Sequence, residues 1–338
     1  MHIAVQVGLL AGLVGVLVLT GRWRLCYWPF RLRPSRMTVG KLGFLVSCPE
    51  NVRRVESITR SFAGGFNAAL TSPSDDAWRR RCDSFGVHDR PFAHEGAAMG
   101  YPLRRLGGKS GRDFEESVVS RRPEMRYLYY VGLGFWSGMR NHTPERMRRV
   151  VEGLDPLYRF LCYDGYGFKV GFFDYLKDRA CITRLDRFEG YARHAAYQGL
   201  GRAFWFLFMD RHDLLIERIG ELGDDAVDAA AGVGLATAFV NTDRLEVAFE
   251  VGLKMPGPWR DHFHQGMCFA LKARSLDDVD EFDKNLSRLP SGSREAAYAA
   301  IRECDRVELL IRDEQADDGY RRWRDQVRRW MADNVEYP

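Results

Sequence analysis

Four short motifs in the chain place an imidazole or phenol ring directly before a carboxylate or a carboxamide. These motifs are His94-Glu95, Tyr163-Asp164, Tyr197-Gln198 and His264-Gln265. Carboxylates can transfer protons, and rings with a polar tip can hold an elongated, unsaturated or partly oxygenated molecule. We therefore expect Glu95 and Asp164 to be catalytic acid/base groups. The expected ligand-binding residues are His94, Tyr130, Tyr163, Tyr197, Gln198, Arg202, His264 and Gln265.

The same residues have a second interpretation, in which they join structural units instead of binding a ligand. In repeat proteins, a polar residue at a fixed position often bonds to the backbone of the neighbouring helical hairpin. Adjacent residues on a helix also diverge by about 100°, so His94 and Glu95 cannot both face one atom. Arg202 could meet a carboxylate or phosphate of a ligand, or it could pair with an acidic residue. The sequence leaves both interpretations open.

Each motif stands just before a glycine, and these glycines recur at nearly constant intervals. Aligned on their shared pattern, the repeat glycines are Gly65, Gly96, Gly132, Gly165, Gly199, Gly232 and Gly266. The intervals lie between 31 and 36 residues, and a period near 34 is typical of stacked helical hairpins. A second glycine follows two positions later at 134, 167, 201 and 234. Small residues on two opposite faces would let a helix pack closely between two neighbours.

The segments between the repeat glycines have the apolar spacing of amphipathic helices. Residues 145–154, 213–222 and 243–252 carry apolar residues at i, i+3 and i+4, and each segment is followed by a turn motif. Pro144 stands where the first position of a helix is expected. Each unit is therefore predicted to be a shorter amphipathic helix, a turn and a longer glycine-bearing helix. We expect an all-α fold in which these hairpins form an α-solenoid or a closed α/α array.

The N-terminal segment predicts a membrane anchor. Residues 3–19 carry no charge, and 17 residues span about 25 Å as a helix, which is the short end of a bilayer crossing. Arginines and aromatic residues follow, and this is typical of the cytoplasmic side. We expect one transmembrane helix in the cell membrane, with the repeat domain in the cytoplasm. A cleaved signal peptide and a buried apolar helix are the alternatives.

The expected domains are an anchor (1–21), a basic and aromatic juxtamembrane linker (22–52), a seven-repeat helical domain with a C-terminal cap (53–310) and an amphipathic tail (311–338). In the tail, Trp323, Val327 and Trp330 share one face, and five arginines make the other face basic. The tail is expected to be either a capping helix with a solvated face or a membrane-surface helix.

Composition and motif searches exclude several classes of protein. The chain has 50 Lys and Arg against 46 Asp and Glu, so its net charge of +4 does not suggest a nucleic-acid-binding protein. Seven cysteines without a CxxC motif argue against a zinc knuckle, and His262 and His264 lack a third ligand at metal-site spacing. No dinucleotide, Walker, G-x-S-x-G or H-E-x-x-H motif is present. We expect no metal and no cofactor, and the sequence does not decide whether the chain is an enzyme.

Several motifs resemble the bacterial domain-of-unknown-function family 1702, which is associated with enediyne biosynthesis. The resembling segments are GGFNAAL at 64–70, FAHEGAAM at 92–99, DPL at 155–157, YDGYGF at 163–168, QGLGR at 198–202, HQG at 264–266 and ALKAR at 270–274. The similarity covers roughly residues 33–304. It implies a protein that accompanies the iterative polyketide synthase of enediyne pathways, together with a membrane protein and a propeller-like partner. The resemblance implies no reaction and no catalytic residues.

Two functions fit these observations. In the first, the chain is an accessory protein of enediyne-type polyketide biosynthesis that binds, and helps convert, a linear polyene intermediate at the membrane. In the second, it is a non-enzymatic, membrane-anchored helical-repeat scaffold for protein partners. A terpenoid-type cyclase is a lesser third hypothesis, because no DxDD motif is present. The expected partners are a hydrophobic polyene-like molecule, a membrane protein or polyketide synthase, and the membrane itself, but no nucleic acid.

Overall fold

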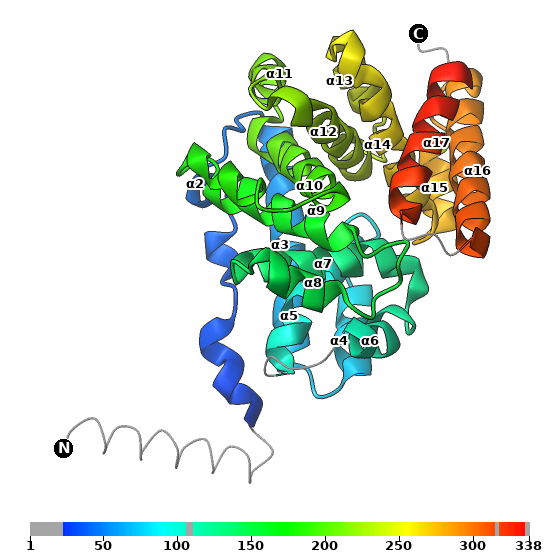
Figure 1. Cartoon of the computed structure of the whole chain (residues 1–338). Helices are drawn as coiled ribbons and strands as arrows, with labels where there is room; N and C mark the ends of the chain where they lie inside the picture. Colours follow the sequence, from blue (N-terminus) through cyan, green and yellow to red (C-terminus); the bar gives the residue numbers. More distant parts are fainter. Residues whose placement is uncertain (1–22, 106–110, 315–317, 335–338) are drawn as a thin grey trace, which may run out of the picture.

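A computed structural model describes residues 23–105, 111–314 and 318–334 (Figure 1). All regular elements in these ranges are helices, which confirms the all-α prediction. The longer, glycine-bearing helices are α3 (Pro49–Thr71), α5 (Arg90–Arg104), α7 (Arg126–Met139), α9 (Leu161–Lys169, lengthened by the π-helical segment Val170–Asp174), α10 (Tyr191–Phe208), α12 (Ala226–Val240) and α14 (Gly257–Ser275).

Shorter helical elements alternate with these along the chain. They are α4 (Asp75–Asp83), α6 (Gly111–Phe114), α8 (Pro144–Val151), the 3-10 helix η6 (Arg179–Arg184), α11 (His212–Gly220), α13 (Glu246–Lys254) and α15 (Val279–Leu286). Two π-helical segments, η3 (Glu115–Val119) and η5 (Val170–Asp174), continue α6 and α9. The 3-10 turns η4 (Pro123–Met125) and η7 (Gly223–Asp225) lead into α7 and α12.

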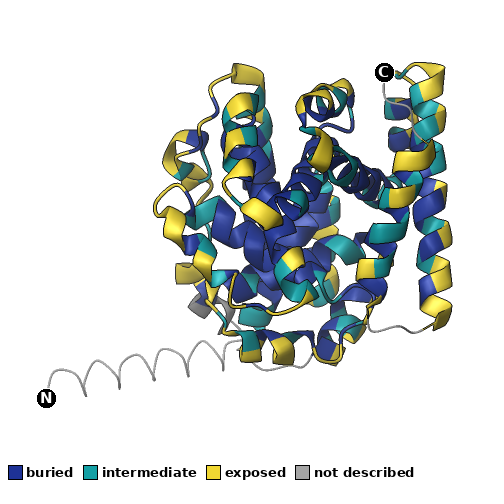
Figure 2. Ribbon diagram, turned by 45° about the horizontal axis from the view of Figure 1, so that its top comes forward, coloured by how far each residue is buried: buried dark blue, intermediate teal, exposed yellow. Residues whose placement is uncertain are grey.

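Local sequence signals explain where the shorter helices begin. Thr143 caps α8 by accepting a hydrogen bond from the Arg146 backbone N–H, and Pro144 occupies the first turn as predicted. Ser74 caps α4 in the same way. Buried residues concentrate in the centre of the molecule, and the peripheral helices present exposed faces (Figure 2). The longer helices therefore form an inner layer, and the shorter ones cover it.

Consecutive longer helices pack against each other in chain order, from α3 through α5, α7, α9, α10 and α12 to α14. The glycines explain how closely they pack. A Cβ atom added at Gly199 would lie 1.8 Å from the Asp164 carbonyl oxygen of the preceding helix. A Cβ atom at Gly201 would lie 1.9 Å from the Ala229 carbonyl oxygen of the following helix. The predicted close packing of each helix between two neighbours is therefore observed.

The register of the first unit differs from the alignment above. Gly65 packs against Ala93 of the following helix, as the second glycine of the other units does. The position equivalent to the repeat glycines is therefore Ala63, two residues earlier. The physical reason is that none of the longer inner helices precedes α3 among the described residues, so the close approach is needed on one face only.

Two helices complete the domain after the glycine repeat. Helix α16 (Ser291–Glu314) packs on α14, and α17 (Gly319–Asn334) packs on both (Figure 1). The apolar face of α17 is buried, since Trp323 and Val327 are at most 2% exposed. Arg324, expected on the solvated basic face, is also buried, because its guanidinium bonds Asp228 and Tyr191 of the inner layer.

No helix within the described ranges combines the length and apolar character needed to cross a membrane. The expected anchor, residues 1–21, lies outside the described residues. The linker that follows forms the 3-10 helices η1 (Trp23–Phe30) and η2 (Pro34–Arg36) and the single turn α2 (Val39–Leu42). Trp28 and Phe30 are 62% and 55% exposed.

Candidate functional site

Two narrow apolar cavities inside the inner layer meet at one arginine. The first has a volume of about 60 Å³ and the second about 50 Å³, and both are lined by Arg202, Leu235 and Phe239. The first is walled by the phenylalanines Phe62, Phe92, Phe135, Phe168, Phe172, Phe173, Phe206 and Phe239. Tyr320 and Trp323 of α17 wall the second. Both cavities belong to one interior that draws on nearly every inner helix.

One face of each inner helix lines this interior. It comprises the residue directly before the repeat glycine and the residues three and seven positions after it, which lie four residues apart and so share a helical face. Phe135, Phe168 and Arg202 hold the position three after, and Phe172, Phe206 and Phe239 hold the position seven after. We call these positions the interior face. The π-helical turn η5 brings Phe173 into the wall beside Phe172.

Arg202 is the centre of a buried charged cluster. Its Nη1 lies 2.5 Å from Asp164 Oδ1, and its Nη2 lies 3.8 Å from Glu95 Oε1. Asp164 Oδ2 accepts a second hydrogen bond from Gln198 Nε2 at 2.7 Å, and the same nitrogen donates to the Tyr320 hydroxyl. The Arg202 guanidinium also lies 4.5 Å from the centroid of the Phe168 ring. The predicted residues Glu95, Asp164, Gln198 and Arg202 are therefore brought together.

The electrostatics of the cluster follow from burial and from the three charges. Burial raises the pKa of Glu95 to about 7, the Asp164 carboxylate adds to this, and Arg202 opposes it. Burial alone would lower the pKa of Arg202, but the two carboxylates outweigh burial and raise it. With Glu95 protonated, Arg202 and Asp164 balance each other and the cluster is neutral.

The rings two positions before the repeat glycines lie elsewhere. His94 Nε2 is 2.9 Å from Asp83 of α4, and Tyr130 donates to Glu115 of η3. Tyr197 donates to Asp186, Tyr163 packs on Phe188, and His264 packs beside Gly252 of α13. None of these five rings lines the two cavities. They face the covering layer, because one step along a helix turns a side chain by about 100°.

Gln265 shares the interior-face position of Glu95 and Asp164, yet it contacts α17. Arg324 Nε lies 3.3 Å from Gln265 Oε1, and its Nη2 bonds Asp228. The phenylalanines of the cavity wall were not among the predicted site residues. The sequence signal that could have predicted this wall is the recurrence of large apolar residues three and seven positions after the repeat glycine. Arg202 is the charged residue at one of these positions.

One family model matches most of the chain. The model of the family described as protein of unknown function (DUF1702) matches residues 28–331. The chain belongs to this family. Searches of the curated proteins and of the solved structures gave no match. The match supports the family resemblance seen in the motifs, and it carries no information about a reaction or about enediynes.

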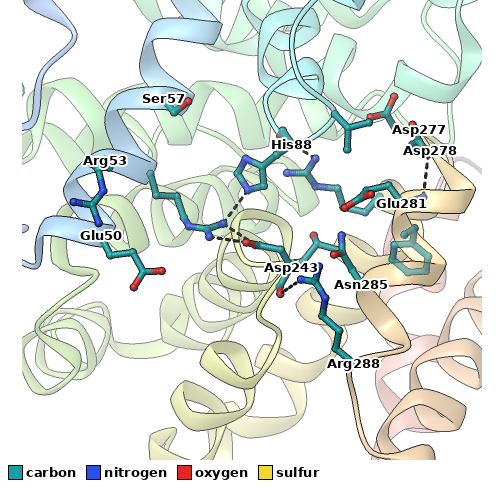
Figure 3. Close-up of a pocket in the computed structure, with 15 residues that line it drawn as sticks. Glu50, Arg53, Ser57, His88, Asp243, Asp277, Asp278, Glu281, Asn285 and Arg288 are labelled. Carbon is teal, nitrogen blue, oxygen red and sulfur yellow. Dashed lines mark hydrogen bonds and ion pairs between the residues drawn. The ribbon is translucent and has the colours of Figure 1, made fainter.

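A larger polar groove of about 540 Å³ lies where the first and last units of this DUF1702 domain meet (Figure 3). Arg54 of α3 makes two hydrogen bonds, of 2.7 and 2.8 Å, to Asp243 after α12. Arg288 donates to the Asp243 backbone carbonyl, and Arg90 pairs with Asp277 and Asp278. Because several of these charged groups pair with one another, we interpret the groove as an ionic seam between the units.

A second polar cluster also has internal partners. Ligand atoms of His194, Asp225 and Asp228 lie within 4.8 Å of one another, which is close enough for a metal ion. However, Asp225 pairs with Arg193, and Asp228 pairs with Arg324. Two guanidinium groups already neutralise the two carboxylates, so this cluster is a weaker candidate than the buried interior.

The raised pKa of Glu95 predicts how stability depends on pH. The folded chain holds the Glu95 proton up to a pH of about 7, whereas the unfolded chain releases it near 4.5. Stability from this group should therefore be full below pH 4.5 and fall as pH rises to 7, by on the order of 3 kcal/mol. The Glu95→Gln variant should lose this dependence. Urea unfolding of both proteins between pH 5 and 8 measures it, and parallel curves would contradict it.

Proposed function

We propose that this DUF1702 protein binds a linear, unsaturated hydrophobic molecule in the interior of its helical repeat, with a polar group of the ligand at Arg202. The observation that carries the proposal is that two aromatic-walled cavities meet at a single buried arginine. Arg202 Nε is buried and has no hydrogen-bond partner, so it has a free N–H to donate. Aromatic walls suit the flat faces of conjugated double bonds.

The charges of the cluster indicate which polar group the ligand carries. Arg202 already has the Asp164 carboxylate at 2.5 Å and the Glu95 carboxyl at 3.8 Å. A third carboxylate would make this buried cluster net negative, and an uncompensated buried charge is costly. A neutral carbonyl can accept a hydrogen bond from Arg202 without adding charge. The ligand is therefore a neutral carbonyl compound.

The size of the interior favours a slender ligand. The two cavities have volumes of about 60 and 50 Å³, whereas pockets for drug-sized ligands have volumes of about 300 to 1,000 Å³. A planar conjugated chain is about as thick as one aromatic ring, so it can enter between the phenylalanine side chains when these rotate. Met139, which is 45% exposed, lines the first cavity and places an opening at the surface.

For the biological setting we propose enediyne-type polyketide biosynthesis at the membrane, with the hairpins forming an α-solenoid around the ligand. Family membership and the motif resemblance support the pathway. The uncharged residues 3–19 support membrane attachment. The exposed Trp28, with the Arg31 guanidinium 4.3 Å from its ring centroid, also suits a membrane interface.

Fluorescence titration with methyl cis-parinarate, a linear conjugated tetraene ester, tests the proposal. Its emission should rise on binding to the full-length protein, and the free acid should bind no better than the ester. Leu235→Trp places a bulky ring where the two cavities meet and should weaken binding at least about tenfold, a loss of 1.4 kcal/mol or more.

The matched control is Leu253→Trp, since Leu253 is 56% exposed and lines neither cavity. This variant should bind the ester as the unmodified protein does. Circular dichroism confirms that both variants are folded. Equal binding by the two variants would contradict an interior site. No binding at all, together with a co-purifying polyketide synthase or membrane protein, would favour the scaffold function.

A further inference from the structure

Glu95 differs from an ordinary structural carboxylate. It lies on the interior face of α5, is 1% exposed and lines the first apolar cavity. Its Oε1 atom is buried and has no hydrogen-bond partner. A buried polar atom without a partner destabilises the folded chain, and a leucine or methionine at this position would avoid that cost. The carboxyl group therefore calls for a functional explanation.

Asp164, at the same position two units later along the chain, shows what a structural carboxylate does here. Its Oδ1 accepts from Arg202 at 2.5 Å, and its Oδ2 accepts from Gln198 at 2.7 Å. Glu95 has no such bonds and reaches Arg202 only at 3.8 Å. Asp164 thus holds the guanidinium in place, and Glu95 Oε1 has unused bonding capacity beside the cavity.

The surroundings allow Glu95 to exist in both protonation states near neutral pH. Among the described residues, the charged groups that act on it are Arg202 of α10 and Asp164 of α9. The other helices around the first cavity present apolar side chains, including Phe62 of α3, Phe135 of α7 and Phe239 of α12. Burial raises the pKa of Glu95 to about 7, which suits a group that takes and returns a proton.

We propose that Glu95 moves a proton between two carbon atoms of a bound unsaturated carbonyl compound and so shifts a carbon–carbon double bond, while Arg202 stabilises the enolate oxygen. This inference rests on the proposed function, because it requires the ligand to lie in the interior. It adds an isomerase activity and a substrate class, namely linear enoyl or polyenoyl carbonyl compounds.

The reaction balances without any further reactant. For a 3-enoyl carbonyl compound, the Glu95 carboxylate takes a proton from C2, and the electrons of that C–H bond form a dienolate. The negative charge on its oxygen faces Arg202, whose Nε–H is free to donate. The Glu95 carboxylic acid then gives the proton to C4. The C3=C4 bond becomes C2=C3, and Glu95 returns to its ionised form.

The cavity favours transfer by one carboxyl group. A space of about 60 Å³ holds few water molecules once a ligand enters, so water cannot protonate the dienolate at random. C2 and C4 of a planar dienolate can both be approached from the same face, so a single carboxyl group above that face can reach both. Asp164 is a positioning residue, since it holds Arg202 and contributes to the pKa of Glu95.

The test uses the full-length protein and the N-acetylcysteamine thioester of (E)-dec-3-enoic acid. The expected product is the conjugated 2-enoyl thioester, followed by ultraviolet absorbance and identified by NMR. Since the free carboxylate is the base, kcat/KM should rise with pH through about 7 and then level off. Glu95→Gln should lower the rate at least about 100-fold. Asp164→Asn should move the pH profile to lower pH, because it removes a negative charge that raises the pKa of Glu95.

The controls separate this inference from the proposed function. Glu115→Gln changes a partly buried glutamate that lines neither cavity, and it should leave the isomerase rate unchanged. Glu95→Gln should still bind methyl cis-parinarate. Binding without isomerisation by the unmodified protein, or full activity of Glu95→Gln, would overturn the isomerase inference alone. Failure to bind the parinarate ester would overturn the proposed function as well.

Discussion

Gly199→Ala is expected to prevent the domain from folding, or to destabilise it by more than about 4 kcal/mol, an exceptional loss for one residue. The added Cβ atom would lie 1.8 Å from the Asp164 carbonyl oxygen and 2.7 Å from the Phe168 backbone nitrogen. These are backbone atoms, so no side-chain rotation can relieve the collision. Helix α9 cannot shift freely either, because it is packed equally closely on α10 at a second point. There, a Cβ atom added at Gly167 would lie 1.8 Å from the Ala196 carbonyl oxygen.

The matched control is Gly292→Ala in α16, where an added Cβ atom meets nothing within 4 Å. Alanine is favoured over glycine in helices by up to about 1 kcal/mol, so this variant should be as stable as the unmodified protein or slightly more stable. Circular dichroism and urea unfolding compare the two. A similar stability for both variants would show that the inner helices can separate to admit a methyl group.

Arg202→Met is the second change with a large expected effect, and it should cost about 3 to 5 kcal/mol. Methionine retains the apolar contact with Phe168 but leaves the Asp164 carboxylate buried without its cation. Gln198 continues to donate to one Asp164 oxygen and cannot neutralise the charge. Urea unfolding at pH 7 measures the loss of stability.

A double variant shows whether the unpaired charge causes the loss. Adding Asp164→Asn to Arg202→Met removes the buried charge and should restore part of the stability, so the two changes should not be additive. The coupling between contacting residues should be about 0.5 to 3 kcal/mol. Additive losses would indicate that Arg202 stabilises the fold through packing alone. Restored stability without restored binding of methyl cis-parinarate would show that the arginine is needed for the ligand.

The glycine repeat links the fold to the site. Because Gly199 and Gly201 fix α10 against both neighbours, the direction of the Arg202 side chain is set by two backbone contacts nearby. The same geometry directs Phe135 of α7 and Phe168 of α9 inward at the equivalent position. An interior with one charged cluster and otherwise aromatic walls is thus built from one repeated arrangement.

Local patterns were enough to predict the all-α fold and the close contact between consecutive inner helices. The recurrence of glycines such as Gly132 and Gly165 predicted helices in close contact, and the apolar spacing of residues 145–154 predicted the shorter helix of a unit. These predictions depend on interactions within a helix and between consecutive helices. The motifs that place a ring before a carboxylate selected Glu95 and Asp164 as candidates, and Arg202 was a candidate because a guanidinium can meet a carboxylate or phosphate.

Tertiary structure alone decided which candidates lie in the interior. His94 and Glu95 are adjacent in sequence, yet His94 bonds Asp83 of the covering layer, whereas Glu95 lines the first cavity. Tyr320, 122 residues after Gln198, contacts it through the folding of α17 over the inner layer. The sequence sets the spacing of side chains along each helix. Which face turns inward depends on how every helix packs on its neighbours, and that is a property of the whole folded chain.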